Sequence, residues 1–384
     1  MQLDFSTANR IIFGSGKLAQ LPQLVSGYGR RALLVRSKNL SVREQILEMI
    51  KSVGVVCADF VIKGEPDLDM VQAGLELARE QDCDFVLGAG GGSVMDVAKA
   101  VAALLANPGD LMEYLEVVGK GQKLVHPSKP VVTIPTTAGT GSEVTRNAVI
   151  SVPSQHVKVS MRSPYMLPAV ALVDPELTFS MPPALTASTG MDAFIQVIEP
   201  YVSVNHNPMV DMFCRDAIPR AARNLFAVYQ DGGKSEARTQ MSWVSLMGGL
   251  SLANAGLGAA HGFAGPIGGM FSAAHGVICA AIMPAVMAAN VAALEERDPH
   301  GIALLRYGEI AEWMTGKPDA KPREAADWMR ELSGNLNIPC LADLGVTTND
   351  FDMIVQKSAV ASSMKGNPVQ LTEKELSTIL ENSL

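Results

Sequence analysis

The chain has no run of basic residues and no excess of positive charge. It contains 31 lysines and arginines against 39 aspartates and glutamates, which gives a net charge of −8. Nucleic-acid binding needs a basic surface, so this balance argues against a nucleic-acid partner.

Cysteine is scarce, and the pairs that would suggest a disulfide framework or a CxxC motif are missing. The five cysteines lie far apart and are odd in number: Cys57, Cys83, Cys214, Cys279 and Cys340. We interpret them as buried thiols in a reducing cytoplasm. The first residues show no basic head followed by an apolar core, so we expect no signal peptide.

Long apolar runs are also absent. The longest, residues 97–106 and 277–287, are well short of the roughly 20 residues that span a bilayer, and we expect both to be buried core helices with no membrane partner. No repeat or low-complexity segment occurs. With 48% hydrophobic and 18% charged residues, a chain of 384 residues fits a globular protein of two domains.

The hydrophobic pattern predicts strands that alternate with helices in the first half of the chain. Short apolar runs are typical of strands in a parallel sheet, and the segments between them have helical periodicity over 40–53 and 70–81. The expected strands cover 31–36, 55–61, 85–88, 131–134 and 169–174, with a hairpin over 149–161. This alternation predicts a Rossmann-like α/β domain with a parallel sheet covered on both faces.

The amino-acid composition of the chain changes after Met181-Pro182-Pro183. From residue 184 the chain is rich in alanine, methionine and leucine at helical spacing, with few β-branched runs. We therefore predict an all-α second domain and place the boundary at residue 182, giving domains 1–182 and 183–384.

A glycine-rich turn, Gly88-Ala89-Gly90-Gly91-Gly92-Ser93, follows one predicted strand and precedes a long apolar helix. Glycines let the backbone approach a ligand closely, and the start of a helix offers free N–H groups and a positive dipole end. These features favour a phosphate-binding loop. An ordinary tight turn remains the alternative.

A second polar loop, residues 135–143, follows the next predicted strand. Its sequence Pro-Thr-Thr-Ala-Gly-Thr-Gly-Ser-Glu interleaves hydroxyl side chains with glycines. Loops at the carboxyl ends of parallel strands converge on one crevice, so we expect this loop and the glycine loop to share a ligand. A loop that merely caps a helix is the alternative.

Two segments of the second half carry groups that suit a divalent ion. Asp192 and Gln196 lie four residues apart in a proline-free run, so a helix would project them from one face. His261 and His275 are separated by a run rich in glycine and proline, which predicts that they come from two elements. One carboxylate, one carboxamide and two imidazoles would then surround an ion, although buried core positions have the same spacing.

Taken together, the ordered motifs resemble the iron-containing (group III) alcohol dehydrogenase family over nearly the whole chain. The motifs are Gly90-Gly91-Gly92-Ser93, the loop 135–143, Asp174-Pro175, Met181-Pro182-Pro183, Thr189-Gly190-Met191-Asp192-Ala193, Ala260-His261-Gly262, His275-Gly276, Pro284 and Asn290. The resemblance implies a dehydroquinate synthase-like architecture, with NAD or NADP in the cleft between the domains. It also implies iron or zinc that polarises a small alcohol or aldehyde, a cytoplasmic location, and a homo-oligomer of two or more subunits.

The resemblance assigns the metal site to Asp192, Gln196, His261 and His275, with His261 and His275 also catalytic. Gln196 stands where the family has a histidine, and Gly265 replaces a further histidine common in the family. A glutamine oxygen is a weaker donor than imidazole for iron or zinc, so we expect lower affinity or a preference for harder ions. The loss at Gly265 removes a candidate proton shuttle and opens space beside the nicotinamide.

The residues expected to hold the dinucleotide, by the same resemblance, are Ser37, Lys38, Gly91, Gly92, Ser93, Asp96, Thr136, Thr137, Thr140 and Lys158. Ser37 stands where the family often has an acidic residue that contacts the ribose, and Arg36 and Lys38 flank it. This favours NADP, or acceptance of both cofactors. The alternatives are a solvated surface pair for Arg36 and Lys38, and an ordinary exposed strand lysine for Lys158.

Three other functions stay open from the sequence. A metal-independent reductase of an activated carbonyl, similar to maleylacetate reductase, would stabilise developing charge through hydrogen bonds from His261, His275 and Gln196. A non-catalytic NADP(H)-binding protein would explain the changes at 196 and 265. Cyclisation chemistry of the dehydroquinate synthase type rests on the architecture alone.

Overall fold

The computed structural model of the chain describes residues 3–155, 157–271 and 273–384. The described chain divides into two compact units, Phe5–Ser180 and Met181–Leu384, and residues 3 and 4 group with the second. We call them the sheet domain and the helical domain. The predicted fold class, a parallel α/β domain followed by an all-helical one, is confirmed.

The sheet domain is built on six parallel strands. In the order in which they lie across the sheet, they are β1 (Ile11–Phe13), β8 (Val170–Val173), β5 (Val131–Pro135), β4 (Phe85–Gly90), β2 (Arg31–Ser37) and β3 (Val56–Ile62). Every residue of β4 and β5 is buried. The continuous apolar runs of the sequence therefore correspond to strands that are covered on both faces.

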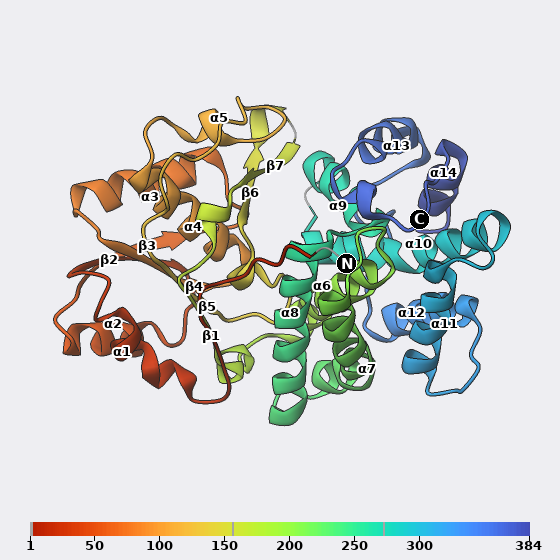
Figure 1. Cartoon of the computed structure of the whole chain (residues 1–384), viewed down its shortest axis with the longest axis horizontal. Helices are drawn as coiled ribbons and strands as arrows, with labels where there is room; N and C mark the ends of the chain where they lie inside the picture. The colour runs from red at the N-terminus through yellow and green to blue at the C-terminus, as the bar shows by residue number, and fades with distance from the viewer. Residues whose placement is uncertain (1–2, 156, 272) are drawn as a thin grey trace. The chain divides into compact units, whose positions relative to one another are not determined.

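Helices cover both faces of this sheet (Figure 1). Leu33 and Val35 of β2 pack with α3 (Leu68–Glu80) and α4 (Gly92–Ala106) on one face. Ala32 and Leu34, the alternate residues of the same strand, pack with α1 (Leu21–Val25) and α2 (Arg43–Ser52) on the other. The two-residue side-chain period of a strand thus divides β2 between two hydrophobic cores.

The strand order contains a topological switch. From β2 the chain passes outward to the edge strand β3 and then returns across β2 to β4. In open parallel sheets, ligands bind beside the carboxyl ends of the strands at such a switch. At these ends lie Ser37, the last residue of β2, and the glycine loop that follows β4.

Shorter elements complete the sheet domain. β6 (Asn147–Val152) and β7 (Val157–Arg162) form the predicted antiparallel hairpin, with Ser151 opposite Lys158. The remaining short elements are η1 (Lys17–Gln20), α5 (Leu111–Tyr114), η2 (Ser142–Val144), η3 (Pro153–Gln155), η4 (Pro164–Met166) and η5 (Pro175–Thr178).

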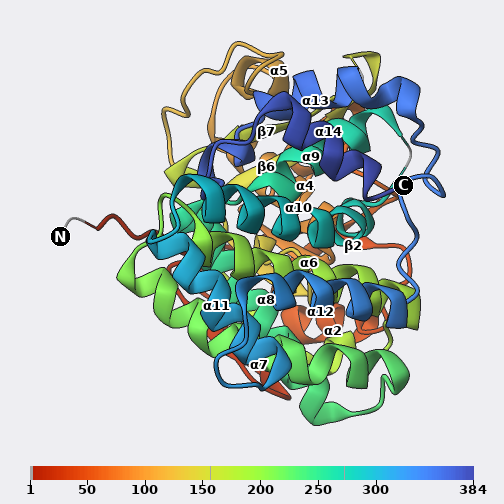
Figure 2. The ribbon, with the colours of Figure 1, turned by 90° about the vertical axis from the view of Figure 1, so that its right-hand side faces the viewer.

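The helical domain is organised around α6 (Pro183–Val202), which is buried along most of its length. A proline at its first position fits a helix start, because that residue has no hydrogen-bond partner to lose. α6 packs against α7, α8 and α10 (Figure 2). The other elements are α7 (Pro208–Gln230), α8 (Ser235–Ala255), α9 (Ala259–Met270), α10 (His275–Arg297), α11 (Ile302–Thr315), α12 (Pro322–Asn335), η6 (Thr348–Asp350), α13 (Phe351–Ala359), η7 (Ser363–Gly366) and α14 (Glu373–Glu381).

His261 and His275 come from two elements, α9 and α10, as the sequence predicted. The break, however, falls after Met270. Gly265 and Pro266 both lie inside α9, where the proline removes one hydrogen bond without ending the helix.

Helix α10 is the one described helix that is long and apolar enough to cross a membrane by length and composition. In the helical domain, 72% of its most apolar window is buried. It is therefore a core helix, as its short apolar run predicted.

Candidate metal centre and nucleotide-binding loops

Asp192 and Gln196 lie one turn apart on α6 and are both buried. Gln196 Nε2 donates a hydrogen bond of 2.9 Å to Asp192 Oδ2. The other carboxylate oxygen, Asp192 Oδ1, lies 3.4 Å from His261 Nε2 and 3.9 Å from His275 Nε2. The structure therefore brings together all four residues that the sequence assigned to the metal.

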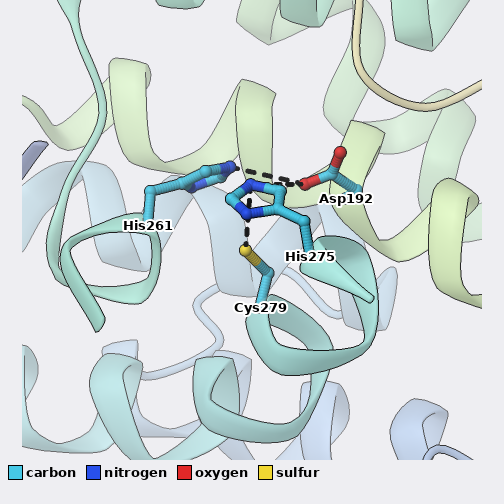
Figure 3. Close-up of side chains that lie close together, drawn as sticks. All are labelled: Asp192, His261, His275 and Cys279. Carbon is cyan, nitrogen blue, oxygen red and sulfur yellow. Dashed lines mark hydrogen bonds and ion pairs between the residues drawn. The ribbon is translucent and has the colours of Figure 1, made fainter. Parts of the chain in front are cut away.

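The two histidines approach this carboxylate from different helices (Figure 3). His261 lies in the first turn of α9 and is buried, whereas His275 begins α10 and its side chain is 40% exposed. Their ring centroids are 5.3 Å apart. One imidazole is thus fixed inside the domain, and the other marks the side of the site that opens to solvent.

Cys279 is a fifth member of the site, which the sequence analysis missed. It lies one turn after His275 on α10, and its Sγ is 3.7 Å from His275 Nε2. One ligand atom from each of Asp192, His261, His275 and Cys279 lies within 4.8 Å of the others. The spacing of His275 and Cys279, four residues apart on a helix, was the available signal, because the same spacing identified Asp192 and Gln196.

Three buried polar atoms at this site have no hydrogen-bond partner among the described residues. They are Asp192 Oδ1, Gln196 Oε1 and His261 Nε2. An unsatisfied buried polar group costs about 1–3 kcal/mol, so three together indicate a missing partner. Nitrogen, oxygen and sulfur donors that converge in this way fit a divalent ion such as zinc or iron.

Glu199 fixes the orientation of His261. Glu199 lies on α6, and its Oε1 accepts a 2.7 Å hydrogen bond from the Ala260 N–H, while Oε2 lies 2.6 Å from His261 Nδ1. Because a carboxylate accepts, His261 Nδ1 carries a proton, and the ring is held with Nε2 toward Asp192. Carboxylate–histidine pairs of this kind support metal ligands in many proteins.

The charged groups of the site stabilise one another against burial. Burial raises the pKa of Asp192, but the close approach of His261 and the charges of both histidines outweigh it, so the pKa lies below its usual value. Burial also raises the pKa of Cys279, and the same two histidines reverse that shift. Burial lowers the pKa of His261, but Cys279, Glu199 and Asp192 hold it well above its ordinary value.

Gly265 lies on α9, one turn after His261. A Cβ added at Gly265 would meet no atom within 4 Å, whereas one added at Gly262 on the same helix would come within 2.9 Å of Met364 Cε. The side chain absent from Gly265 therefore leaves open space.

In the sheet domain, the two predicted cofactor loops pack against each other. The Thr136 N–H donates to Gly90 O at 2.9 Å. A Cβ at Gly91 would lie 3.4 Å from Thr137 Cγ2, and one at Gly92 would lie 2.7 Å from Thr140 Cγ2. A side chain at position 92 would therefore crowd Thr140 of the second loop.

The glycine loop leads directly into α4. Gly91 is the N-cap residue, no side chain caps the helix, and Ser93 lies in its first turn. The first N–H groups of a helix have no partner within it and carry its positive dipole end. This end of α4, bordered by the threonine loop, fits a phosphate group.

Asp96 and Lys99 hold the second loop in place. Asp96 Oδ1 accepts from Ser142 Oγ at 2.7 Å and Oδ2 from the Val149 N–H at 3.1 Å. The buried Lys99 Nζ donates to Ser142 Oγ at 2.7 Å and to Thr145 Oγ1 at 3.0 Å. Both oxygens of Asp96, a predicted cofactor residue, are therefore engaged within the domain. The sequence analysis did not identify Lys99.

The predicted adenosine end contains a carboxylate that the sequence analysis did not consider. Arg36 forms two hydrogen bonds with Asp59 of β3, 2.6 Å from Nε and 2.9 Å from Nη2. Arg43 also pairs with Asp59, at 2.7 Å. Arg36 is therefore already paired, while Ser37 is half-buried and Lys38 is exposed.

Lys158, the last predicted cofactor residue, lies on β7. Its Nζ is 3.4 Å from Glu65 Oε2, and its side chain is only 12% exposed. Lys158 is therefore not an ordinary exposed strand lysine, which was the alternative interpretation.

The fold and these features define a class of protein. The parallel-sheet domain carries a loop suited to phosphate, and the helical domain carries a cluster suited to a metal ion. This combination is typical of a nicotinamide-dependent oxidoreductase. A family model described as iron-containing alcohol dehydrogenase matches residues 8–175, and a model for the C-terminal part of the Fe-containing alcohol dehydrogenase family matches residues 186–384. The chain therefore belongs to the iron-containing alcohol dehydrogenase family, as its motifs predicted.

Relatives match over nearly their whole length. Alcohol dehydrogenase 4 of Saccharomyces cerevisiae (strain YJM789) is 33% identical over 377 residues, which cover 97% of this chain and 96% of that protein. NAD-dependent methanol dehydrogenase of Bacillus methanolicus is 32% identical over 380 residues, 97% of both chains. A crystal structure of 1,3-propanediol oxidoreductase superposes with a TM-score of 0.92 at 31% identity, and the match covers 100% of both chains.

This membership makes the chain an oxidoreductase of the alcohol dehydrogenase type, which acts on CH–OH groups. It sets aside the hypothesis of a non-catalytic binding protein.

Proposed function

We propose that the protein is an NAD(P)-dependent alcohol dehydrogenase or aldehyde reductase for small alcohols or aldehydes. We assign the divalent metal to Asp192, His261 and His275. The observation that carries this proposal is the pair of buried donor atoms without a hydrogen-bond partner, Asp192 Oδ1 and His261 Nε2, which face each other. The names of relatives, an alcohol dehydrogenase, a methanol dehydrogenase and a 1,3-propanediol oxidoreductase, support short alcohols as the substrate class.

The residues of the chain prepare this chemistry before substrate arrives. Glu199 Oε2 holds the proton of His261 on Nδ1, which keeps Nε2 available as a donor. Gln196 Nε2 occupies Asp192 Oδ2, which leaves Oδ1 for the site. When bound, the metal would act as a Lewis acid on the substrate oxygen, and the nicotinamide would exchange the hydride. The exposed side of His275 gives a small substrate access from solvent.

We assign the dinucleotide to the loops around Gly91, Gly92, Ser93 and Thr136–Thr140, with Ser37, Lys38 and Lys158 as further contacts. The uncapped start of α4 supports a diphosphate there. Asp59 pairs with both Arg36 and Arg43, so fewer free cations surround Ser37 than the sequence suggested. We therefore expect NADH and NADPH to bind with comparable affinity. Asp96 has its carboxylate engaged and would act by holding the second loop.

Metal analysis joined to activity tests the proposal. Protein purified without chelator is assayed for metal, then for oxidation of ethanol and 1,3-propanediol and reduction of the corresponding aldehydes, with NAD(H) and NADP(H). We expect about one ion per chain, and activity that falls on chelation and returns with zinc or iron. Full activity without bound metal would overturn the metal-dependent mechanism.

A metal-independent reductase, similar in type to maleylacetate reductase, is the second candidate. The replacement of the family's histidine by Gln196 favours it, because the amide and the two imidazoles offer hydrogen bonds to an oxyanion. It predicts that Asp192→Ala retains substantial activity on an activated carbonyl. Loss of turnover that added metal restores would contradict it.

We also propose a cytoplasmic homo-oligomer. The five cysteines are free thiols, which suits a reducing compartment, although Cys57 and Cys340 are half-buried and not buried as expected. The family resemblance supports a dimer or larger assembly. Light scattering behind size exclusion measures the mass of the assembly, and a monomer at assay concentration would refute this part.

A further inference from the structure

The metal centre as assigned above has three strong donors and one weak one. Gln196 stands at the fourth position, but its amide is already committed, because Nε2 donates to Asp192 Oδ2. The reverse orientation would set a carbonyl oxygen against a carboxylate, so the amide is fixed by its partner. Its Oε1 lies against α8, 3.3 Å from where a Cβ of Gly248 would stand. Gln196 therefore serves Asp192 better than it serves an ion.

Cys279 offers the donor that Gln196 does not. Its Sγ is fully buried, on the turn of α10 that follows His275 (Figure 3). In a tetrahedral zinc site, with bonds of about 2.0 Å to nitrogen or oxygen and about 2.3 Å to sulfur, neighbouring donors are about 3.3–3.6 Å apart. The corresponding separations here are 3.4 Å from Asp192 to His261, 3.9 Å from Asp192 to His275 and 3.7 Å from His275 to Cys279.

We propose that Cys279 is the fourth protein ligand of the metal and that Gln196 is a positioning residue for Asp192. This inference rests on the metal centre of the proposed function and deepens it. A thiolate favours zinc over harder ions such as manganese or magnesium. The expected metal preference is therefore opposite to the preference for harder ions that Gln196 alone suggested. The substrate oxygen would take a further coordination position on the exposed side of His275.

Cobalt substitution tests the proposal without reference to turnover. The purified protein is stripped of metal, loaded with Co²⁺ and examined by absorption spectroscopy. We expect ligand-field bands in the visible range and a sulfur-to-cobalt charge-transfer band in the near ultraviolet. In Cys279→Ser the charge-transfer band disappears, whereas in the control Cys214→Ser, a buried thiol on α7 of the same domain, it remains. Gln196→Ala keeps the band and weakens zinc binding about 10–100-fold, as removal of a supporting residue does.

X-ray absorption gives a second measurement that needs no variant. The native protein is loaded with zinc, and the fine structure at the zinc K-edge is recorded. We expect a sulfur neighbour at about 2.3 Å beside nitrogen and oxygen neighbours at about 2.0 Å. A shell of nitrogen and oxygen alone contradicts the proposal, even if Cys279→Ser does not fold.

The outcomes separate this inference from the function on which it rests. Ligand-field bands without a sulfur band, or a sulfur band that survives Cys279→Ser, would leave the metal centre in place and overturn the role of Cys279. A cobalt spectrum that matches the free aqueous ion would overturn both. A sulfur band in a protein with no dehydrogenase activity would support the ligand and contradict the proposed reaction.

Discussion

The polar groups of the two domains are arranged in opposite ways. Around the glycine loop of the sheet domain, Asp96, Lys99, Ser142 and Thr145 satisfy one another through hydrogen bonds. Around Asp192 in the helical domain, three buried polar atoms have no partner among the described residues. A satisfied network holds backbone in place, and an unsatisfied one indicates a ligand. Substitutions around the glycine loop should therefore alter stability, and substitutions around Asp192 should alter ligand binding and rate.

The largest effect is expected from Asp192→Ala. It removes the one carboxylate that faces both histidines, so kcat/KM for alcohol oxidation should fall about 10³-fold, which corresponds to about 4 kcal/mol of transition-state stabilisation. The melting temperature is measured alongside, because the variant also loses the hydrogen bond from Gln196 Nε2 to Asp192 Oδ2. Steady-state kinetics with and without chelator measure this, and the variant should no longer respond to chelation. A variant with most of its activity would point to the metal-independent reductase.

Lys99→Met tests the satisfied network. Lys99 is fully buried, and its ammonium bonds Ser142 and Thr145 near Asp96. Removing one partner of a buried charged group costs about 3 kcal/mol in unfolding free energy. Urea unfolding measures the change. The control is Lys129→Met, at an exposed lysine of the same domain, and its unfolding free energy should stay within about 0.5 kcal/mol of the parent protein. Equal stabilities would show that the network does not hold the loop.

Glu143, at the end of the second loop, gives the sheet domain a pH dependence. Burial raises the pKa of Glu143 from 4.5 to about 7, although the nearby Lys99 lowers it. The folded pKa is above the unfolded one, so this contribution to stability is fully present below about pH 4.5 and is lost as the pH rises to about 7. Between pH 5 and pH 8 the unfolding free energy of the parent protein should fall by about 2 kcal/mol through Glu143, and Glu143→Gln should lack this fall. Unfolding at pH 5 and pH 8 measures the difference, and parallel profiles for Glu143→Gln and the parent protein would contradict it.

Gly92→Ala tests the packing of the two cofactor loops. The added methyl would come within 2.7 Å of Thr140 Cγ2, so one loop must move. Overpacking of this kind costs about 1 kcal/mol or more, and we expect NADH to bind about tenfold more weakly. Isothermal titration measures this. Thr140→Ser in the same chain removes the clashing methyl and should restore part of the affinity, and no recovery would place the effect elsewhere.

The smallest effect is expected from Gly265→His, because the position is open. The unfolding free energy should change by less than about 0.5 kcal/mol. Gly262→Ala, a smaller change on the same helix, should cost more, because its Cβ would meet Met364 at 2.9 Å. Thermal unfolding of the two variants compares them, and the reverse ranking would show that the space beside Gly265 is filled.

Local sequence patterns were sufficient for the strands and for most residues of the candidate metal centre. Buried parallel strands appear as apolar runs, and Asp192 and Gln196 follow from helical spacing. The same rule applied to His275 would have found Cys279, which was interpreted only as a buried thiol. Asp96 was assigned to the cofactor because it follows the glycine loop.

Hydrogen bonds between residues far apart in the chain could not be predicted from the sequence. Asp96 meets Ser142 and Val149, and Arg36 meets Asp59, across separations set by the order of strands in the sheet. No local pattern marks such partners, so the charge around Ser37 was judged without Asp59. The support of His261 by Glu199 was missed for the same reason, since it depends on how α6 packs against α9.

The bonds of Glu199 to Ala260 and His261 involve protein atoms alone. Protein groups alone therefore orient the imidazole, so the aim of His261 in the proposed metal centre would not depend on the ion. If the metal centre is as proposed, removal of the ion would leave a folded protein whose turnover returns when the ion is supplied again.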